Sequence, residues 1–572
     1  MVEQTTSEAG NGASGQESYN FADWARRYSQ HTNRSLAGAR LALPTVAGSR
    51  DPRLLALVSQ AQQWGMSLAG STTVARPPRS AAAEETRTEH KPADERCQHK
   101  TPLGTKTVEG AESIRKNSGT DQNDDENEDR PTDGDSGRPV GQTAINNDAA
   151  FDFAYTGVDQ VTDMREQSGT QAMAYAQEHM PILHQLMGQV ASRHDLSGTS
   201  IAVCLILEPK TAVLLRELAQ TGARVGVCCE SGAVDQRVAD QLKTEGILVQ
   251  ADASWNEEQA RQGALDLLDQ LQPNLIIDDG ASFARLASRE RPDLAARLVG
   301  VAEETTSGVR AFEAMEAAGA LTYPVIAVND SQMKTGFDNA HGTGESCVTT
   351  MQEILGSHCF AGTRLTVIGY GPVGEGFAKR VRALGAQVTV CDSDPRAALK
   401  AVFDGFPARN INQALPQADM AISATGVYHT IALEHMRAMR PGALLAVIGG
   451  IANEIALDQL PDFHPVNGRK IRSISVPDGP ELTLLAEGDG VNYTAGGGNP
   501  IEIMDLSFAV QAAALAYLLD QRGELTPGVH RLPESTDRHI ASLALAARGY
   551  QASQPLADHS HSWQVTRFDH EH

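Results

Sequence analysis

The chain has 572 residues, and its 48 Lys and Arg against 72 Asp and Glu give a net charge of −24. This length suffices for about three or four domains, and the negative charge argues against a nucleic-acid partner held through a basic face. The chain does not open on a cationic start followed by an apolar run, and no apolar stretch approaches the ~20 residues that a membrane span needs. Its seven cysteines include no CxxC spacing. We therefore expect a cytoplasmic protein with reduced thiols, no metal ion, no nucleic acid and no membrane.

Helical periodicity predicts an N-terminal helical arm over residues 1–75. Trp24 and Tyr28 lie four residues apart, and the apolar cluster from Leu54 to Val58 starts a second helix that reaches Trp64. An accessory arm is the simpler interpretation, and an arm that docks a partner is the alternative.

Residues 76–160 contain few large apolar side chains and many acidic or small polar ones. The stretch Asp121 to Asp135 alone carries eight acids against one Arg. Such a segment buries too little apolar surface to offset the entropy of ordering it. We predict a disordered acidic linker, which is either a solvated spacer or an interaction tail.

After the linker, apolar strands alternate with helices. One amphipathic helix is expected over Met173–Met187, and the strands are expected at Ile201–Leu207, Ala223–Cys229, Gly246–Ala251 and Asn274–Gly280. Because each strand is apolar throughout, they favour a parallel sheet covered on both faces. The predicted fold class is therefore α/β.

The segment Arg364 to Pro395 has the pattern of a dinucleotide-binding turn, in which a strand, a GxGxxG turn, a helix and a second strand follow one another. The glycines permit a tight turn and the close approach of a pyrophosphate, and the helix N-terminus offers free N–H groups. Asp392 lies 23 residues after Gly369 and can accept a bond from a ribose 2′-OH, which favours NAD over NADP. The predicted cofactor contacts of this turn are Gly369, Gly371, Val373, Gly374 and Asp392.

Acidic residues follow two of the predicted strands, and a lysine follows a third. Asp279 and Glu304 each close an acidic pair, and Lys334 lies four residues before Asp338. Taken alone, the acids at 303–304 could cap a helix, and the Lys-Asp pair could be a solvated ion pair worth ~0.3 kcal/mol. Ligands bind at strand exits in open α/β sheets, and a lysine can polarise a hydroxyl. Together these residues predict chemistry on a sugar hydroxyl.

Residues from about 173 to 548 resemble the S-adenosylhomocysteine hydrolase family, the NAD-dependent adenosylhomocysteinases. The similar stretches, in the family's order, are IIDDG, EETTSGV, VNDSQMKTGFDN, GYGPVGEGFA, SDP and LLAEGDGVN. The resemblance implies a Rossmann NAD-binding domain, residues 346–499, inserted in a discontinuous α/β substrate domain, residues 161–345 and 500–550. Residues 551–572 would form a C-terminal tail. The family is usually tetrameric, which implies a homo-oligomer here, a tetramer or a dimer.

The family oxidises the 3′-OH of a substrate ribose with bound NAD, eliminates the 5′ substituent from the resulting ketone, adds water and reduces the ketone again. The resemblance assigns Lys334 and Asp338 to the sugar hydroxyls. It assigns Glu304 to the support of that lysine, and Asp279 to proton transfer near C4′ and C5′. The residues that it places on NAD are Thr305, Thr306, Ser307, Asn339 and Asn492.

Other positions depart from the family around the base and C5′. The residues that stand where the family has different functional groups are Ile206, Glu208, Lys210, Thr343, Gly450 and Asn499. The leading hypothesis is a diverged member that oxidises a nucleoside-type substrate and promotes elimination or hydrolysis at C4′/C5′. The alternatives are ordinary S-adenosylhomocysteine hydrolysis and a non-catalytic NAD-binding regulator.

Overall fold

The computed structural model describes residues 20–42, 52–68, 153–154, 163–451, 453–466 and 468–554. The chain divides into two compact units, Met1–Val74 with Phe151–His572, and Ala75–Ala150. All of the described residues belong to the first unit. The predicted linker and the predicted C-terminal tail therefore lie outside the described residues, apart from 153–154 and 551–554.

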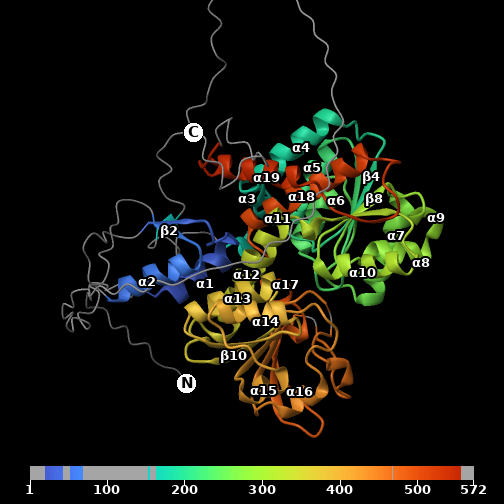
Figure 1. The fold of residues 1–572 in the computed structure, drawn as a ribbon. Helices are drawn as coiled ribbons and strands as arrows, with labels where there is room; N and C mark the ends of the chain where they lie inside the picture. Colours follow the sequence, from blue (N-terminus) through green and yellow to red (C-terminus); the bar gives the residue numbers. More distant parts are fainter. Residues whose placement is uncertain are drawn as a thin grey trace, which may run out of the picture. The chain divides into compact units, whose positions relative to one another are not determined.

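Seven parallel strands form the first sheet, in the order β16-β9-β8-β7-β4-β5-β6 (Figure 1). Their bounds are β4 Ser200–Cys204, β5 Arg224–Cys228, β6 Leu248–Gln250, β7 Leu275–Asp278, β8 Gly300–Glu303, β9 Pro324–Ala327 and β16 Gly528–His530. Every residue of β4, β7 and β8 is buried, as the apolar pattern predicted. The strand order reverses between β4 and β7, which in open α/β sheets marks the crevice where ligands bind.

Helices cover both faces of this sheet. One face packs against α3 (Gly169–Glu178), α4 (Pro181–Arg193), α5 (Pro209–Gln220), α6 (Gln236–Thr244), α18 (Ile501–Asp520) and α19 (Glu534–Ala547). The other packs against α7 (Glu257–Leu271), α8 (Ser282–Glu290), α9 (Pro292–Ala295) and α10 (Thr306–Ala317). Successive residues of β4 alternate between the two cores, so that Ile201 and Val203 face one and Ala202 and Cys204 the other.

The prediction of one helix over Met173–Met187 is wrong. The chain forms two helices there, because α3 ends at Glu178 and α4 begins with Pro181. A proline has no N–H to donate and fits the first turn of a helix, so it starts a new one.

Helix α18 is the one helix of the described residues that is long and apolar enough to cross a membrane. In its most apolar window, 78% of the residues are buried inside the protein. The helix lies against α4, and fourteen of its residues are buried, ten of them in the first core, so it is a core helix.

The second sheet has six strands in the order β11-β10-β12-β13-β15-β14, with only β14 antiparallel to its neighbour. Its strands are β10 Arg364–Ile368, β11 Gln387–Cys391, β12 Met420–Ser423, β13 Leu444–Val447, β14 Ile471–Ser475 and β15 Glu481–Leu485. The helices of this half are α12 Gly344–Leu355, α13 Pro372–Ala383, α14 Pro395–Phe403, α15 Ile411–Ala414, α16 Leu433–Ala438 and α17 Val491–Thr494. The predicted strand, glycine turn, helix and strand are confirmed as β10, α13 and β11.

The two predicted N-terminal helices are α1 (Phe21–Thr32) and α2 (Pro52–Gln63), and they are part of a core rather than an accessory arm. Trp24 and Trp64 are each 1% exposed and belong to the apolar cluster of the second sheet. Figure 1 shows α1 and α2 beside α12 and α13.

A small parallel sheet accompanies these helices. Its strands are β1 (Arg40–Ala42), β2 (Ser67–Leu68) and β3 (Phe153–Ala154), in the order β2-β1-β3. Because β3 pairs with β1, residues 153–154, which the predicted linker included, form a strand beside the N-terminal helices. We call residues 20–68, in their described parts, the N-terminal segment.

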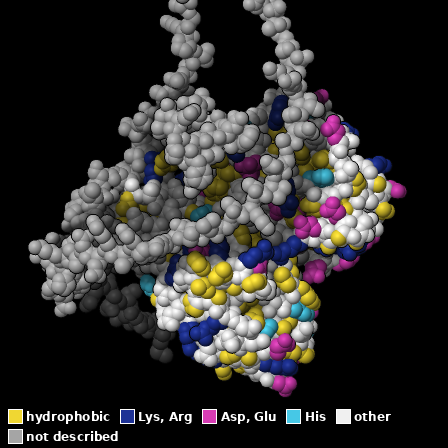
Figure 2. All heavy atoms as spheres, viewed as in Figure 1, with side chains coloured by type: hydrophobic (Ala, Val, Ile, Leu, Met, Phe, Trp, Pro, Cys, Tyr) yellow, Lys and Arg dark blue, Asp and Glu magenta, His cyan; other side chains and the backbone are white. Residues whose placement is uncertain are grey.

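The described face drawn in Figure 2 carries Lys and Arg scattered among Asp and Glu, with apolar side chains between them.

Candidate active site

A cavity of about 1890 Å³ lies where strand exits of both sheets meet. Its walls come from the turns after β4, β7 and β8, from the glycine turn after β10, and from residues 489–499. Single ligand pockets usually measure about 300–1,000 Å³. This cavity therefore has room for a dinucleotide and a second small molecule.

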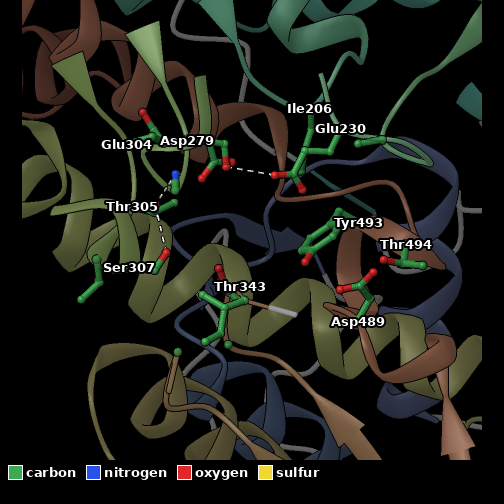
Figure 3. A pocket seen from close by; sticks show the side chains of 18 of the residues that line it. Ile206, Glu230, Asp279, Glu304, Thr305, Ser307, Thr343, Asp489, Tyr493 and Thr494 are labelled. Atoms are coloured by element: carbon green, nitrogen blue, oxygen red, sulfur yellow. Dashed lines mark hydrogen bonds between the residues drawn. The ribbon is translucent and has the colours of Figure 1, made fainter. Parts of the chain in front are cut away.

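In each of the two acidic pairs, one member supports the fold and the other lines the cavity. Asp278 and Glu303 are fully buried and accept backbone N–H groups at the start of α8. Burial raises the pKa of both carboxyls, to about 7 for Asp278. The second members, Asp279 and Glu304, line the cavity (Figure 3). Only one acid of each predicted pair is therefore available to a ligand.

Lys334 lies at the centre of a buried polar cluster. It ends α11 (Gln332–Lys334), and the chain continues as the π-helical segment η4 (Thr335–Thr343). Its Nζ lies 2.9 Å from Asn339 Oδ1, 3.5 Å from Asp338 Oδ2 and 3.8 Å from Glu304 Oε1. The side chain of Lys334 is only 4% exposed, so the alternative of a solvated surface pair is wrong.

Burial and the neighbouring charges shift the protonation of this cluster. Burial raises the pKa of Glu304 to about 7, although Lys334 opposes the shift. Burial also raises the pKa of Asp279, to about 6, and the carboxylate of Glu230 adds to it. For Lys334, burial lowers the pKa, but Asp338 and Glu304 outweigh it and the net shift is upward. The lysine is thus held as a cation beside acids that titrate near neutrality.

Helix α18 orients the acids of the cluster. Ser507 Oγ donates to Asp338 Oδ2 at 2.7 Å, and Gln511 Nε2 donates to Glu304 Oε2 at 2.5 Å. Glu304 Oε1 is buried and has no hydrogen-bond partner among the residues that the structure describes, although Lys334 Nζ lies 3.8 Å from it. A buried carboxylate oxygen without a partner is costly, so a ligand hydroxyl that donates to it fits here.

Sequence reasoning missed these two α18 residues. Ser507 and Gln511 stand four apart in a helix that is otherwise mostly apolar. That spacing places them on one face of the helix. Two polar side chains on one face of a core helix are a pattern from which the sequence could have predicted their role.

The predicted nicotinamide contacts connect to the lysine through a chain of hydrogen bonds. Thr306 Oγ1 donates to Asn329 Oδ1 at 3.0 Å, and Asn339 Nδ2 donates to the same oxygen at 3.0 Å. Thr305 caps α10 and donates from Oγ1 to Glu303 at 2.8 Å. A Cβ built on Gly450, in the second half, would lie 3.9 Å from Ser307 Oγ. These side chains therefore stand at the junction of the two sheets.

The glycine turn has the geometry that a dinucleotide needs. Gly369 has φ +94°, and a Cβ there would lie 2.8 Å from the carbonyl oxygen of Ala424. A Cβ on Gly374 would lie 2.0 Å from Gly369 O, so helix and turn pack without a gap. A Cβ on Gly371 would meet nothing within 4 Å, at the N-terminus of α13. This open space beside free N–H groups fits a pyrophosphate.

The remaining predicted cofactor residues lie around that turn. Val373, Asp392 and Asn492 all line the cavity. Asp392 Oδ2 accepts the N–H of Tyr370 at 2.6 Å, and Oδ1 accepts that of Asp394 at 2.8 Å. The backbone therefore fixes the carboxylate at the end of β11 while one side of it stays open to the cavity.

Most of the positions that depart from the family face the same cavity. Ile206, Glu208, Thr343, Gly450 and Asn499 line it, whereas Lys210 is buried behind Glu208. Asn499 is fully engaged in hydrogen bonds: Nδ2 donates to Asp338 at 2.6 Å, and Oδ1 accepts from Ser346 and Asn492, each at 2.9 Å. It bridges polar groups, and it cannot act as an acid or base there because a side-chain amide has no ionisable group near neutral pH.

Three more polar groups at the cavity went unnoticed in the sequence. Figure 3 shows Glu230 near Asp279, with Tyr493 and Asp489 across the space from them. Desolvation raises the pKa of Asp489 to about 6, and Glu230 adds to the shift. Glu230 follows β5, Asp489 lies in the motif LLAEGDGVN and Tyr493 lies in α17. No common spacing links the three, so the sequence did not indicate that they share one cavity.

The fold and the site define an α/β enzyme that binds NAD. The chain matches the family profile described as S-adenosyl-L-homocysteine hydrolase over residues 159–291, and that described as its NAD-binding domain over residues 339–498. An S-inosyl-L-homocysteine hydrolase of Methanopyrus kandleri is 37% identical over 391 residues, which cover 68% of this chain and 92% of that protein. An adenosylhomocysteinase of Thermotoga maritima is 36% identical over 406 residues, covering 69% and 100%. The chain belongs to the S-adenosyl-L-homocysteine hydrolase family.

Proposed function

We propose that the protein oxidises the ribose 3′-OH of a nucleoside 5′-thioether of the homocysteine type and then releases the 5′ substituent. The observation that carries this proposal is the buried cluster of Lys334, Asp338 and Glu304 beside the dinucleotide turn. Relatives with similar identity are named for S-adenosyl- and S-inosyl-homocysteine. A nucleoside joined to homocysteine is therefore the substrate class that this site suits best.

In the proposed reaction, NAD held in the cavity would supply the hydride acceptor for a reversible oxidation at the sugar C3′. Lys334, as a cation, stabilises the negative charge on O3′ as its proton leaves. Glu304 Oε1 accepts no hydrogen bond from the described residues and belongs to a carboxyl with a pKa of about 7, so it suits acceptance of that proton. Asp338 is oriented by Ser507 and Asn499 and holds the sugar hydroxyls in place.

Asp279 is the proposed base for the second stage. A ketone at C3′ acidifies the neighbouring C4′–H, so a carboxylate with a pKa of about 6 is strong enough to remove that proton. The electron pair of the C4′–H bond then forms a C4′=C5′ double bond, the 5′ sulfur leaves with the pair of the C5′–S bond, and water adds to the double bond. Thr305, Thr306, Ser307, Asn339 and Asn492 would hold the nicotinamide half in contact with this region.

The proposed domain arrangement is an NAD-binding domain, residues 346–499, within a discontinuous substrate domain, residues 161–345 and 500–550. It is supported by β16 and α18, which follow the second sheet in the chain and belong to the sheet and core of the first. We also propose a homo-oligomer, a dimer or a tetramer, on the basis of the family. Its native mass in light scattering tests this statement.

Reduction of bound nicotinamide is the direct test of the reaction. The full-length protein with NAD is mixed with adenosine, inosine and other nucleosides, and the absorbance of reduced nicotinamide is followed. A signal with adenosine supports ordinary S-adenosylhomocysteine hydrolysis, and a signal confined to other nucleosides supports the diverged substrate. Bound NAD without a signal from any nucleoside would contradict the proposed enzymatic reaction and favour a non-catalytic NAD-binding regulator.

A further inference from the structure

Two cysteines stand side by side in the wall of the cavity. Cys204 ends β4 and Cys228 ends β5, and the two are register partners of these parallel strands. Both belong to the apolar core between the first sheet and helices α7 to α10, so their side chains lie on the same face of the sheet. Among the cysteines that the structure describes, only these two are paired in register across neighbouring strands.

The spacing of the strands suits a disulfide between them. Neighbouring strands lie about 4.7–4.9 Å apart, and the Cα atoms of a disulfide are usually about 4.4–6.8 Å apart. The two thiols already interact, because a hydrogen bond with the thiol of Cys228 is the largest cause that raises the pKa of Cys204, ahead of burial. A bond between the two sulfurs therefore needs little movement of the backbone.

The cavity gives small reagents access to this pair. Cys204 and Cys228 are only 7% and 1% exposed, but both line the cavity. Cys229 lines it too, and its side chain belongs to the core on the opposite face of the sheet, so it points away from Cys204. Cys229 is therefore a matched control for its neighbour.

We propose that Cys204 and Cys228 are a redox-sensitive pair that a peroxide converts to a disulfide in the cavity wall. One thiolate attacks a peroxide oxygen, the O–O bond breaks, and the products are a sulfenic acid and water. The second thiol attacks that sulfur, the S–S bond forms, and a second water leaves. The two sulfurs together lose two electrons, and one hydrogen peroxide is reduced to two waters. An added dithiol reverses the step by thiol–disulfide exchange.

The disulfide would shift two strand exits that carry residues of the cavity. Ile206 and Glu230 each stand two residues after one of the cysteines, and both line the cavity. The carboxylate of Glu230 adds to the raised pKa of Asp279, the proposed base. Because a misplacement of about 1 Å can cost about a hundredfold in rate, the oxidised protein should be the slower form. This consequence rests on the proposed function, whereas the disulfide itself does not.

Peptide mapping tests the disulfide without reference to activity. The full-length protein with NAD is treated with hydrogen peroxide, its remaining thiols are alkylated, and it is digested with trypsin. Cleavage after Lys and Arg releases residues 194–210, which contain Cys204, and residues 225–237, which contain Cys228 and Cys229. We expect the two peptides to be joined in the oxidised protein and separate after treatment with dithiothreitol.

Cys228→Ala and Cys229→Ala decide which cysteine forms the bond. The joined peptides should be absent from Cys228→Ala and present in Cys229→Ala. With the nucleoside that reduces bound NAD fastest, peroxide should slow this reduction about tenfold or more in the wild type and in Cys229→Ala. Dithiothreitol should restore the rate, and Cys228→Ala should not respond to peroxide.

Separate peptides in the oxidised wild type, or joined peptides in oxidised Cys228→Ala, would overturn the inference. Joined peptides with an undiminished rate of nicotinamide reduction would overturn the effect of the pair on the reaction. A protein with reduced thiols that reduces no nicotinamide with any nucleoside would contradict the proposed function instead, and the peptide map would still decide whether the disulfide forms.

Discussion

Lys334 and Asp338 illustrate how burial changes the meaning of a spacing. Four residues apart on an exposed helix, they would form a pair worth ~0.3 kcal/mol. In the structure, their side chains are 4% and 5% exposed, and α18 supplies a hydrogen bond to the aspartate. The same two residues thus become the centre of the candidate active site.

Lys334→Ala should abolish the reduction of bound NAD without releasing NAD. The ammonium stabilises charge on the sugar oxygen and lies in the substrate cluster, so its loss should cost about 10²–10⁴-fold in rate. Single-turnover absorbance of reduced nicotinamide measures the effect. Lys379→Ala is the control, since Lys379 forms an i,i+4 pair with Glu375 at 2.6 Å on a side chain that is 40% exposed. Reduction at the parental rate in Lys334→Ala would remove this lysine from the mechanism.

The pH dependence of the elimination step should report Asp279. A base must be ionised to accept a proton, and the pKa of Asp279 is raised to about 6. The rate should therefore fall as the pH drops through about 6 and level off above it. Asp279→Asn should lower the rate of elimination about 10²–10⁴-fold. The fall of the rate at acidic pH, the acidic limb of the profile, should disappear in the same variant. A variant that keeps the limb would show that another group titrates there.

NAD should bind more tightly than NADP, by at least about tenfold, because of Asp392. The carboxylate is held in place by two backbone N–H groups, so it cannot turn away from an added 2′-phosphate. Titration of the cofactor-free protein with each dinucleotide gives the two dissociation constants. Equal affinities would show that the ribose lies elsewhere.

At the scale of elements, the π-helical segment η4 explains why Lys334 meets both Asp338 and Asn339. In an α-helix a residue five positions on points away from the first, but the wider π turn, with its i→i+5 bonds, brings it back to the same face. The contact of Lys334 Nζ with Asn339 Oδ1 at 2.9 Å joins residues five apart. Local sequence patterns describe α-helical and strand periods, so this geometry was not predictable from them.

The N-terminal helices should contribute strongly to stability, since they complete the core of the second sheet. Trp64 is 1% exposed, meets Phe21 edge to face at 5.4 Å and lies 5.8 Å from the guanidinium of Arg380. Trp64→Ala should lower the free energy of unfolding by about 3–5 kcal/mol, as measured by urea denaturation. Tyr550→Ala, at a side chain 48% exposed, should change it by less than about 0.5 kcal/mol. If Trp64→Ala changed the free energy of unfolding as little as Tyr550→Ala does, the N-terminal helices would be an accessory arm after all.

For the whole molecule, we expect residues 77–150 to be dispensable for folding. Their composition offers little apolar surface for a core, and the strands on either side of them, β2 and β3, both pair with β1. Replacing the segment with a short Gly-Ser linker should keep the thermal midpoint within about five degrees, because a segment of this composition has little apolar surface to bury. Insoluble protein or a much lower midpoint would show that the segment carries structure the composition does not indicate.

The amino-acid sequence by itself determined the α/β class, the dinucleotide turn from Gly369 to Asp392 and the family of the chain. These depend on local signals: apolar strands, glycines at fixed offsets and long motifs in order. Only the tertiary structure decided that Asp278 and Glu303 are structural while Asp279 and Glu304 face the cavity, and that α18 orients two of the acids. It alone joined Asn33 to Lys210, which are 177 positions apart in the chain. Such contacts depend on how separate elements pack against one another, and local patterns record which face of an element is buried but not which residues cover it.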